Sequence, residues 1–454
     1  MGALNRAGLN RAWVAGLFAL FWLGLFGYGA LLVATAAPGG LFPRIAAPPP
    51  LPHPRGRILA ADGTPLALSP RPGTRVYPLG PLAGQVVGYT ERAHGRYGKG
   101  LAGVERRANL TLARGGDVRL TLDPKVQALA EAALVRGVRA ARARWGALLV
   151  MARDGRLLAV ANAPLFDPQS PRGAPGEDPR LTNYAFRYRI EPGSTVKALT
   201  AATLLEAGAV RIGERIPVPY RRRVADRWVR DWHWHREEAW SLEDILAHSS
   251  NVGISLLAER IPKATLYRTF ERLHLSDPRL LPGFSVAPIF APLDRWGPVK
   301  YANATFGQGF AITPLHLTAA MNALIDGRFH RPRLLAGDQG MAVRVFRPEV
   351  VDRVRAMLER RLAHRARLAG YRLAGKTGTA QIAVPGGYDP ERVVTLFAGF
   401  VPGDRPRATA VVVLYDPRVD PKDRFGSKLA APVFRELAEG LLAYWGVPPR
   451  GNLK

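Results

Sequence analysis

Residues 189–208 have the sequence RIEPGSTVKALTAATLLEAG, and the interpretation of the whole chain starts from this stretch. The Pro-Gly pair predicts a turn, and the apolar residues after it recur at helical spacing until Gly208. Ser194 is therefore expected at a helix N-terminus, with Lys197 one turn further on the same face. A lysine with a neutral amine can take the proton of a serine hydroxyl and make it a nucleophile. An isolated Ser-x-x-Lys is more often a helix cap beside a solvated lysine. Whether Ser194 is a nucleophile therefore depends on the other motifs of the chain.

Two further motifs offer groups that could complete a cleft around this serine. Ser249 and Asn251 form the only Ser-x-Asn of the chain, directly after an expected helix. A hydroxyl at this position can relay a proton, and a carboxamide can bind a substrate amide, although the same residues are also common in helix caps. Lys376 adds a second ammonium group, which would keep Lys197 neutral and attract a carboxylate.

Residues 373–382, LAGKTGTAQI, are expected to form a strand. The hydroxyls of Thr377 and Thr379 can bind a substrate carboxylate, and Gly378 would let a substrate backbone come close. A rival interpretation exists, because residues 370–377 match the P-loop pattern. A P-loop needs a strand before it and a helix after it. A basic, helix-like segment precedes this one and a poor helix former follows, so the strand is favoured.

In this order, the Ser-x-x-Lys, Ser-x-Asn and Lys-Thr-Gly motifs resemble those of the penicillin-recognising serine acyltransferases. The resemblance extends over nearly the whole chain and is closest to the class B penicillin-binding proteins, which are monofunctional peptidoglycan D,D-transpeptidases. The segments SSNVGI and FGQG favour the cell-division (FtsI-like) type. Segments similar to the N-terminal pedestal of that class lie at 55–67 and 98–105, and segments similar to its catalytic domain lie at 154–168, 306–314 and 397–402.

The resemblance implies a chemical role for each motif. Ser194 would be acylated by a peptidoglycan stem peptide with release of the terminal D-alanine, and the amine of a second stem would then take the acyl group. β-Lactam antibiotics would acylate the same serine, and no cofactor is expected. The other implied roles are general base for Lys197, proton relay to the leaving amine for Ser249 and Lys376, binding of the substrate amide for Asn251, and an oxyanion hole made by the backbone N–H groups of Ser194 and Thr379.

Three alternatives to a division-type transpeptidase stay open on the sequence alone. The first is an elongation-type class B transpeptidase, because residues 230–235 are similar to that type. The second is a D,D-carboxypeptidase, which passes the same acyl group to water. The third is a non-catalytic divisome scaffold on the same fold, against which the intact Ser194, Lys197 and Lys376 argue.

Strands near both ends of the main domain enclose a helical middle, which predicts the α+β class with an antiparallel sheet flanked by helices. The resemblance identifies this as the serine penicillin-recognising transpeptidase fold. Expected elements include helices at 124–141 and 432–445, a hairpin at 146–160, and strands at 118–122, 376–382, 393–400 and 408–415. The expected organisation is a cytoplasmic tail at 1–11, a transmembrane helix at 12–37, a Pro-rich linker at 38–54, a small β-rich, dimerisation-like pedestal at 55–117, and a transpeptidase domain at 118–454.

Residues 12–37 are apolar and carry no charge, and a bilayer core needs roughly 20 such residues. Arg6 and Arg11 precede the run, so the N-terminus is expected in the cytoplasm. The protein is therefore predicted to be a single-pass inner-membrane protein with a periplasmic catalytic domain. No separate glycosyltransferase domain is expected, so the enzyme is predicted to be monofunctional. The resemblance implies a polytopic membrane glycosyltransferase and other divisome proteins as partners.

Composition excludes several other classes of function. The chain has no cysteine, which rules out disulfides, thiolate catalysis and cysteine-based zinc sites. The net charge is +28, but the arginines are scattered rather than gathered in blocks, so no nucleic-acid partner is predicted. Asp231, His233 and His235 could suggest a metal site, but no distant further ligand is evident. A Trp-rich substrate rim or simple packing is the favoured interpretation of that stretch, and no metal is predicted.

Overall fold

The computed structural model describes residues 53–93, 96–171 and 178–450, which belong to one compact unit. The predicted transmembrane helix at 12–37 lies outside the described residues. Among the helices that are described, none is both long and apolar enough to cross a membrane. The domain boundaries expected from the sequence stay predictions.

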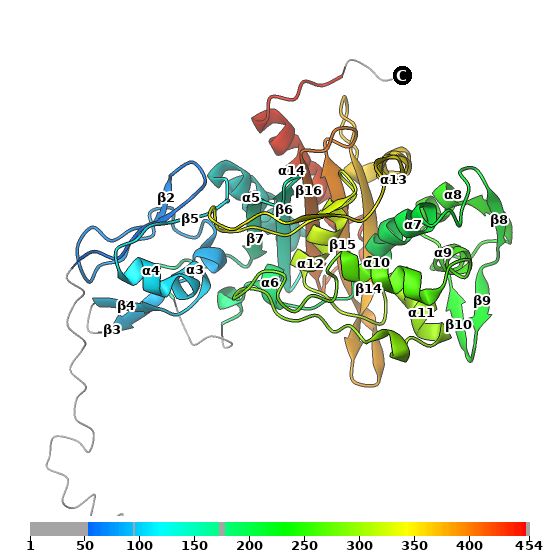
Figure 1. The fold of residues 1–454 in the computed structure, drawn as a ribbon, viewed down its shortest axis with the longest axis horizontal. Coiled ribbons are helices and arrows are strands. Elements are labelled where there is room, and N and C mark those ends of the chain that lie inside the picture. Colours follow the sequence, from blue (N-terminus) through cyan, green and yellow to red (C-terminus); the bar gives the residue numbers. More distant parts are fainter. Residues whose placement is uncertain (1–52, 94–95, 172–177, 451–454) are drawn as a thin grey trace, which may run out of the picture. The chain divides into compact units, whose positions relative to one another are not determined.

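A five-stranded antiparallel sheet lies at the centre of this unit, in the order β14-β15-β16-β6-β7 (Figure 1). Side chains alternate between its faces, as the two-residue period of a strand requires. Leu148 and Val150 enter one core, whereas Ala147 and Leu149 enter the other. The predicted α+β class with an antiparallel sheet is confirmed. The strands are β6 (Trp145–Ala152), β7 (Leu157–Ala163), β14 (Ala374–Val384), β15 (Gly387–Val401) and β16 (Ala408–Tyr415).

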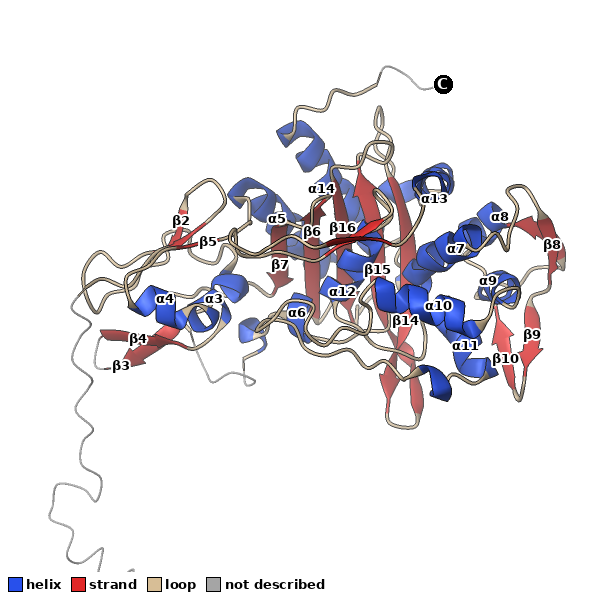
Figure 2. Cartoon of the chain, in the orientation of Figure 1, coloured by secondary structure: helices blue, strands red, loops and turns tan. Residues whose placement is uncertain are grey.

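Helices flank the sheet, as Figure 2 shows. On one face, α5 (Pro124–Ala141) and α14 (Ala430–Tyr444) form a core with the strands. The start of α5 follows from Asp123, whose carboxylate accepts hydrogen bonds from two backbone N–H groups, with proline at the first helical position. Helix α12 (Pro314–Asn322) is buried throughout and packs on the sheet from the core of the other face.

The remaining elements lie between these parts of the chain, and some of them contribute residues to the cleft described below. The helices are α6 (Tyr184–Arg187), α7 (Lys197–Glu206), α8 (Leu242–His248), α9 (Asn251–Ala258), α10 (Lys263–Arg272), α11 (Pro298–Thr305) and α13 (Pro348–Arg360). The 3₁₀ turns are η1 (Pro179–Leu181), η2 (Gly193–Val196), η3 (Leu293–Arg295), η4 (His364–Ala366) and η5 (Pro421–Asp423). The small strands are β8 (Arg215–Val218), β9 (Arg221–Val224), β10 (Arg227–Arg230), β11 (Glu238–Ser241), β12 (Arg328–His330) and β13 (Ala342–Arg344).

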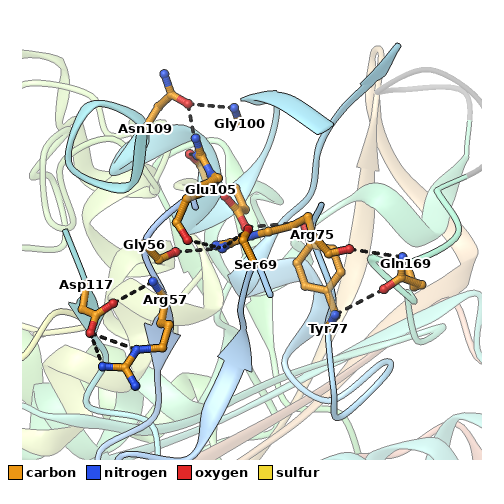
Figure 3. A network of polar contacts seen from close by, with 11 residues as sticks. Gly56, Arg57, Ser69, Arg75, Tyr77, Gly100, Glu105, Asn109, Asp117 and Gln169 are labelled. Atoms are coloured by element: carbon orange, nitrogen blue, oxygen red, sulfur yellow. Dashed lines mark hydrogen bonds and ion pairs between the residues drawn. The ribbon is translucent and has the colours of Figure 1, made fainter. Parts of the chain in front are cut away.

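The segment predicted as a pedestal contains a buried cluster of charged side chains (Figure 3). Glu105 is fully buried and accepts hydrogen bonds from Arg75 Nε at 2.6 Å and from Arg55 Nε at 2.8 Å. Arg75 also donates to the Gly56 carbonyl at 2.7 Å, and Arg55 donates to Asn109 Oδ1 at 3.1 Å. Because buried charges are tolerated only with partners, this cluster makes the local fold depend on all three charged residues.

Regular elements around this cluster are short. A three-stranded sheet has the order β2-β1-β5, in which β1 and β5 run parallel. Strand β5 ends at Arg119, so the predicted strand at 118–122 is shorter than expected. Beyond Arg119, Leu120 still donates its N–H to the Leu59 carbonyl at 2.7 Å, but it also forms a bridge to Leu335. The elements are β1 (Ile58–Leu59), β2 (Pro65–Ala67), α2 (Gly84–Val87), β3 (Thr90–Ala93), β4 (Arg96–Gly100), α3 (Gly103–Arg107), α4 (Asn109–Ala113) and β5 (Val118–Arg119).

Candidate active site

The candidate nucleophile lies on a tight turn at the start of α7. Ser194 is part of the 3₁₀ turn η2, which continues directly into α7. The sequence predicted that an ordinary α-helix begins here. The structure differs in that the first turn, which carries Ser194, is a tighter 3₁₀ turn. Gly193, at a φ of +53°, donates its N–H to the Gly307 carbonyl at 3.0 Å, and the Thr195 hydroxyl donates to the Pro192 carbonyl at 2.6 Å. These two hydrogen bonds fix the turn that carries the serine.

Lys197 is positioned to act on this serine. Its Nζ donates to Ser194 Oγ at 2.9 Å, to Ser249 Oγ at 3.3 Å and to the Ser249 carbonyl, and the side chain is completely buried. Burial and then the positive charge of Lys376 hold the pKa of Lys197 well below its usual value, whereas Asp231 opposes this shift. The amine is therefore biased toward its neutral form, as a general base requires.

Ser249 lies between the two lysines. Lys376 Nζ donates to Ser249 Oγ at 2.9 Å and to the Thr377 carbonyl at 3.2 Å. Burial lowers the pKa of Lys376 to about 8. Ser249 follows α8 in the left-handed region, with a φ of +55°, and this turn places its side chain within reach of both amines. The structure therefore brings the predicted residues together as a continuous polar chain from Ser194 through Lys197 and Ser249 to Lys376.

Asn251 begins α9, and its position depends on Asp231. Asp231 Oδ1 accepts hydrogen bonds from the backbone N–H of Asn251 at 2.6 Å and of Val252 at 3.0 Å. Its Oδ2 accepts from the Ser250 hydroxyl at 2.6 Å, and Ser250 Oγ in turn accepts from Gly253 N. The carboxylate thus caps α9 and holds the whole Ser-x-Asn segment. This capping role of Asp231 was not predicted, because nothing in the local pattern links it to residues about twenty positions away.

The three residues considered as a metal site do not converge. His235 Nε2 lies 3.0 Å from Asp231 Oδ2, whereas the His233 ring contacts Phe425 with a centroid distance of 6.1 Å. Among the described residues, no group of three or more acidic or histidine side chains could hold a metal ion. Trp232 and His233 line the cleft instead, beside Phe425.

Strand β14 forms one wall of the cleft. Thr377 and Thr379 face it, and Thr379 Oγ1 accepts a hydrogen bond from Gly426 N at 3.1 Å. Gly378 does not line the cleft. A Cβ at Gly378 would lie 3.0 Å from the Thr195 methyl group, so the glycine makes room for the nucleophile turn rather than for a bound backbone. Since residues 374–384 form one strand that continues into a hairpin, the structure contradicts the P-loop alternative.

The cleft has a volume of about 450 Å³ and brings the motifs into one place. Residues from the nucleophile turn, the Ser-x-Asn segment, β14 and the loop before α14 share its walls. Figure 1 shows the labelled elements among these, α8, α9 and β14, near one another, together with α7. Among the predicted residues, the cleft is lined by Ser194, Ser249, Asn251, Lys376, Thr377 and Thr379, whereas Lys197 lies beneath it.

Glu191 is a further residue of the site that sequence analysis did not single out. Its Oε1 accepts hydrogen bonds from Gly309 N and from the Tyr388 hydroxyl, both at 2.9 Å. Burial raises the pKa of this carboxyl. Glu191 thus connects the residues before the nucleophile to the FGQG segment and to the β14–β15 hairpin. Its place directly before Pro-Gly-Ser was the one available signal.

Comparisons with known proteins agree with this geometry. The family model "Penicillin binding protein transpeptidase domain" matches residues 145–439. The peptidoglycan D,D-transpeptidase FtsI of Escherichia coli is 31% identical over 343 residues, which cover 73% of this chain and 57% of that protein. The probable peptidoglycan D,D-transpeptidase FtsI of Caulobacter vibrioides is 30% identical over 405 residues, which cover 84% of this chain and 67% of that protein.

A solved structure is also similar. It is the penicillin-binding protein 3 of Mycobacterium tuberculosis in complex with aztreonam, with 28% sequence identity and a TM-score of 0.80. The match covers 88% of this chain and 98% of that one. The likeness therefore includes residues on both sides of the expected boundary at 117.

Proposed function

Because the chain belongs to the penicillin-binding protein transpeptidase family, as a class B member of the FtsI type, we propose that it cross-links peptidoglycan stem peptides during septal wall synthesis through an acyl-enzyme on Ser194. The observation that carries this proposal is the contact between a completely buried lysine and the serine hydroxyl. Lys197 Nζ lies 2.9 Å from Ser194 Oγ, and its pKa is held well below the usual lysine value.

In the first half of the reaction, Ser194 Oγ attacks the carbonyl carbon between the last two D-alanines of the donor stem, and Lys197 takes the hydroxyl proton. The developing oxyanion accepts hydrogen bonds from the backbone N–H groups of Ser194 and Thr379. The C–N bond then breaks, and a proton passes to the nitrogen of the departing D-alanine. Ser249 Oγ is the relay, since it lies 3.3 Å from Lys197 Nζ and 2.9 Å from Lys376 Nζ.

In the second half, the amine of a second stem attacks the ester carbonyl. Lys197 takes one proton from that amine, the ester C–O bond breaks, and the proton returns to Ser194 Oγ. Asn251 binds the backbone amide of the donor, and the hydroxyls of Thr377 and Thr379 bind its terminal carboxylate beside the ammonium group of Lys376. β-Lactams acylate Ser194 by the same first step.

The setting of this reaction is part of the proposal. A helix at 12–37 would anchor the chain in the inner membrane, with the N-terminus in the cytoplasm and the catalytic domain in the periplasm. A polytopic membrane glycosyltransferase would supply the glycan strands, together with other divisome proteins. The uninterrupted apolar run and the arginines before it support this topology.

Covalent labelling tests the nucleophile. The detergent-solubilised chain is incubated with a fluorescent penicillin beside the Ser194→Ala variant. Label on the wild type alone is expected, whereas label on both proteins would refute the choice of serine. A donor stem is then offered with and without an amine acceptor, which distinguishes transfer to an amine from transfer to water. A transpeptidase forms the dimeric product, whereas a carboxypeptidase releases only the trimmed stem.

A further inference from the structure

The hairpin of β9 and β10 has two chemically different faces. Paired residues of an antiparallel hairpin share a face, and successive pairs alternate between the two faces. Arg222 pairs with Val229, and Val224 pairs with Arg227. On this face both valines are buried, and Arg222 makes an ion pair with Glu259 on the adjoining α9 segment. The hairpin is therefore held to the body of the protein by this face.

The opposite face is formed by Arg221, Arg223, Trp228 and Arg230, and we call it the Arg–Trp face. All four residues are exposed, and Trp228 is 57% exposed. The Arg221 guanidinium lies 4.8 Å from the centroid of the Trp228 ring, so one side of the indole is occupied by a cation. In the described part of the chain, no carboxylate pairs with any of these three arginines. A solvated hairpin needs neither an exposed tryptophan nor three uncompensated charges of the same sign around it.

The Arg–Trp face adjoins the catalytic cleft. Arg230, the last residue of β10, accepts a hydrogen bond through its carbonyl from Asn251 Nδ2 at 3.1 Å. Two residues later, Trp232 is 58% exposed and lines the cleft, where its ring lies 5.9 Å from that of Phe425. Cationic and aromatic surface therefore continues from the cleft onto the hairpin. Figure 1 shows β9 and β10 next to α9 and α11.

We propose that the Arg–Trp face binds the peptidoglycan strand whose stem occupies the cleft. This inference rests on the proposed function, since that function supplies the polymer. Peptidoglycan presents sugar rings with flat C–H faces and stems with carboxylates. An exposed indole provides a stacking surface for the sugar, and guanidinium groups pair with carboxylates through two parallel hydrogen bonds. An anionic lipid surface offers similar charge, but the continuity of the face with the cleft favours the polymer substrate.

The test is co-sedimentation of the full-length, detergent-solubilised chain with purified peptidoglycan sacculi. A face variant carries Arg221→Ser, Arg223→Ser and Trp228→Ser. A matched control carries Arg365→Ser, Arg435→Ser and Tyr444→Ser, which remove the same charge and one exposed aromatic ring elsewhere. The dissociation constant for sacculi is expected to rise about tenfold for the face variant and to stay within about twofold for the control. Added salt is expected to weaken the wild type more than the face variant.

Three results would overturn the proposal. One is a wild type that does not sediment with sacculi. Another is a face variant that binds as tightly as the control. The third is a face variant that keeps its affinity for sacculi but loses binding to mixed micelles of phosphatidylglycerol, which would make the face a lipid-docking surface.

Two further measurements distinguish a loss of binding at the Arg–Trp face from misfolding of a variant and from a failure of the proposed function. Thermal melting of each variant, together with Trp228→Ser alone, separates lost binding from lost folding. Fluorescent-penicillin labelling of the wild type reports the chemistry of Ser194 without any polymer, so a failure of the proposed function is read independently of the sedimentation result.

Discussion

Replacement of Asp231 tests whether this carboxylate organises the catalytic cleft. Four polar groups depend on it: the N–H groups of Asn251 and Val252, the Ser250 hydroxyl and the His235 ring. Val252 and Ser250 are almost completely buried. Each buried group left without a partner costs about 1–3 kcal/mol. Asp231→Ala is therefore expected to lower the free energy of unfolding by about 3–5 kcal/mol, as for other broken buried charge clusters.

A second consequence of Asp231 concerns the base. Its negative charge raises the pKa of Lys197 against the larger effects of burial and Lys376. An uncharged residue at 231 is therefore expected to lower the pKa of Lys197 further. If Lys197 must be neutral to accept the proton, the acidic limb of the acylation rate moves to lower pH in Asp231→Asn, while the rate on the plateau falls because Asn251 is less well held.

The assay is the second-order rate of acylation by a fluorescent penicillin as a function of pH, with denaturant unfolding measured on the same samples. Asp226→Asn is the matched control, because Asp226 lies in the turn of the hairpin that precedes Asp231, but its side chain is 76% exposed and pairs with the exposed Arg227. Its effect on unfolding is expected to stay within about 0.5 kcal/mol. An acidic limb that moves to higher pH in Asp231→Asn, or an unfolding free energy unchanged in Asp231→Ala, would refute the reasoning.

Three other predictions follow from single contacts. In Lys376→Met the positive charge that lowers the pKa of Lys197 is lost, so the acidic limb of acylation is expected to move to higher pH, and a shift in the opposite direction would contradict the proposed coupling. Gly378→Ala would place a Cβ 3.0 Å from the threonine methyl group of the nucleophile turn, so it should destabilise the fold by about 1–3 kcal/mol and slow acylation, whereas Gly337→Ala meets no atom within 4 Å and should do neither; equal effects would refute the steric argument. Glu105→Gln would leave two buried guanidinium groups without their counter-charge, and a loss of about 3 kcal/mol is expected in thermal or denaturant unfolding; an unchanged melting temperature would show that the cluster does not hold the local fold.

Local signals in the sequence were enough to predict those helices and strands whose ends are marked by residues of the same segment. Helix α5 begins and ends where Asp-Pro and the Ala-rich run place it, and β16 coincides with the expected strand at 408–415. The strand predicted at 118–122 is longer than β5, because beyond Arg119 the backbone divides its hydrogen bonds between the β1 segment and residues 334–335 from a distant part of the chain. Local patterns cannot report such competition between partners.

The same distinction holds for the candidate site. Three motifs with fixed spacing predicted that Ser194, Lys197 and Lys376 meet, and the structure brings them together. The residues that hold this site in place could not be predicted from the sequence. Asp231 holds the Ser-x-Asn segment across a separation of about twenty residues, and Gly378 serves the neighbouring turn, which no one-dimensional pattern reveals.

The parallel pairing of β1 with β5 has a mechanical consequence. The chain enters the described region just before β1, and β5 continues toward α5. A pull on residues upstream of His53 acts along β1 in one direction, while the body of the protein holds β5 in the other. The hydrogen bonds between these two strands are then loaded together in shear, rather than opened one after another as in a peeled hairpin. Tension at this end of the chain would therefore be passed along the polypeptide to the helix that packs against the catalytic sheet.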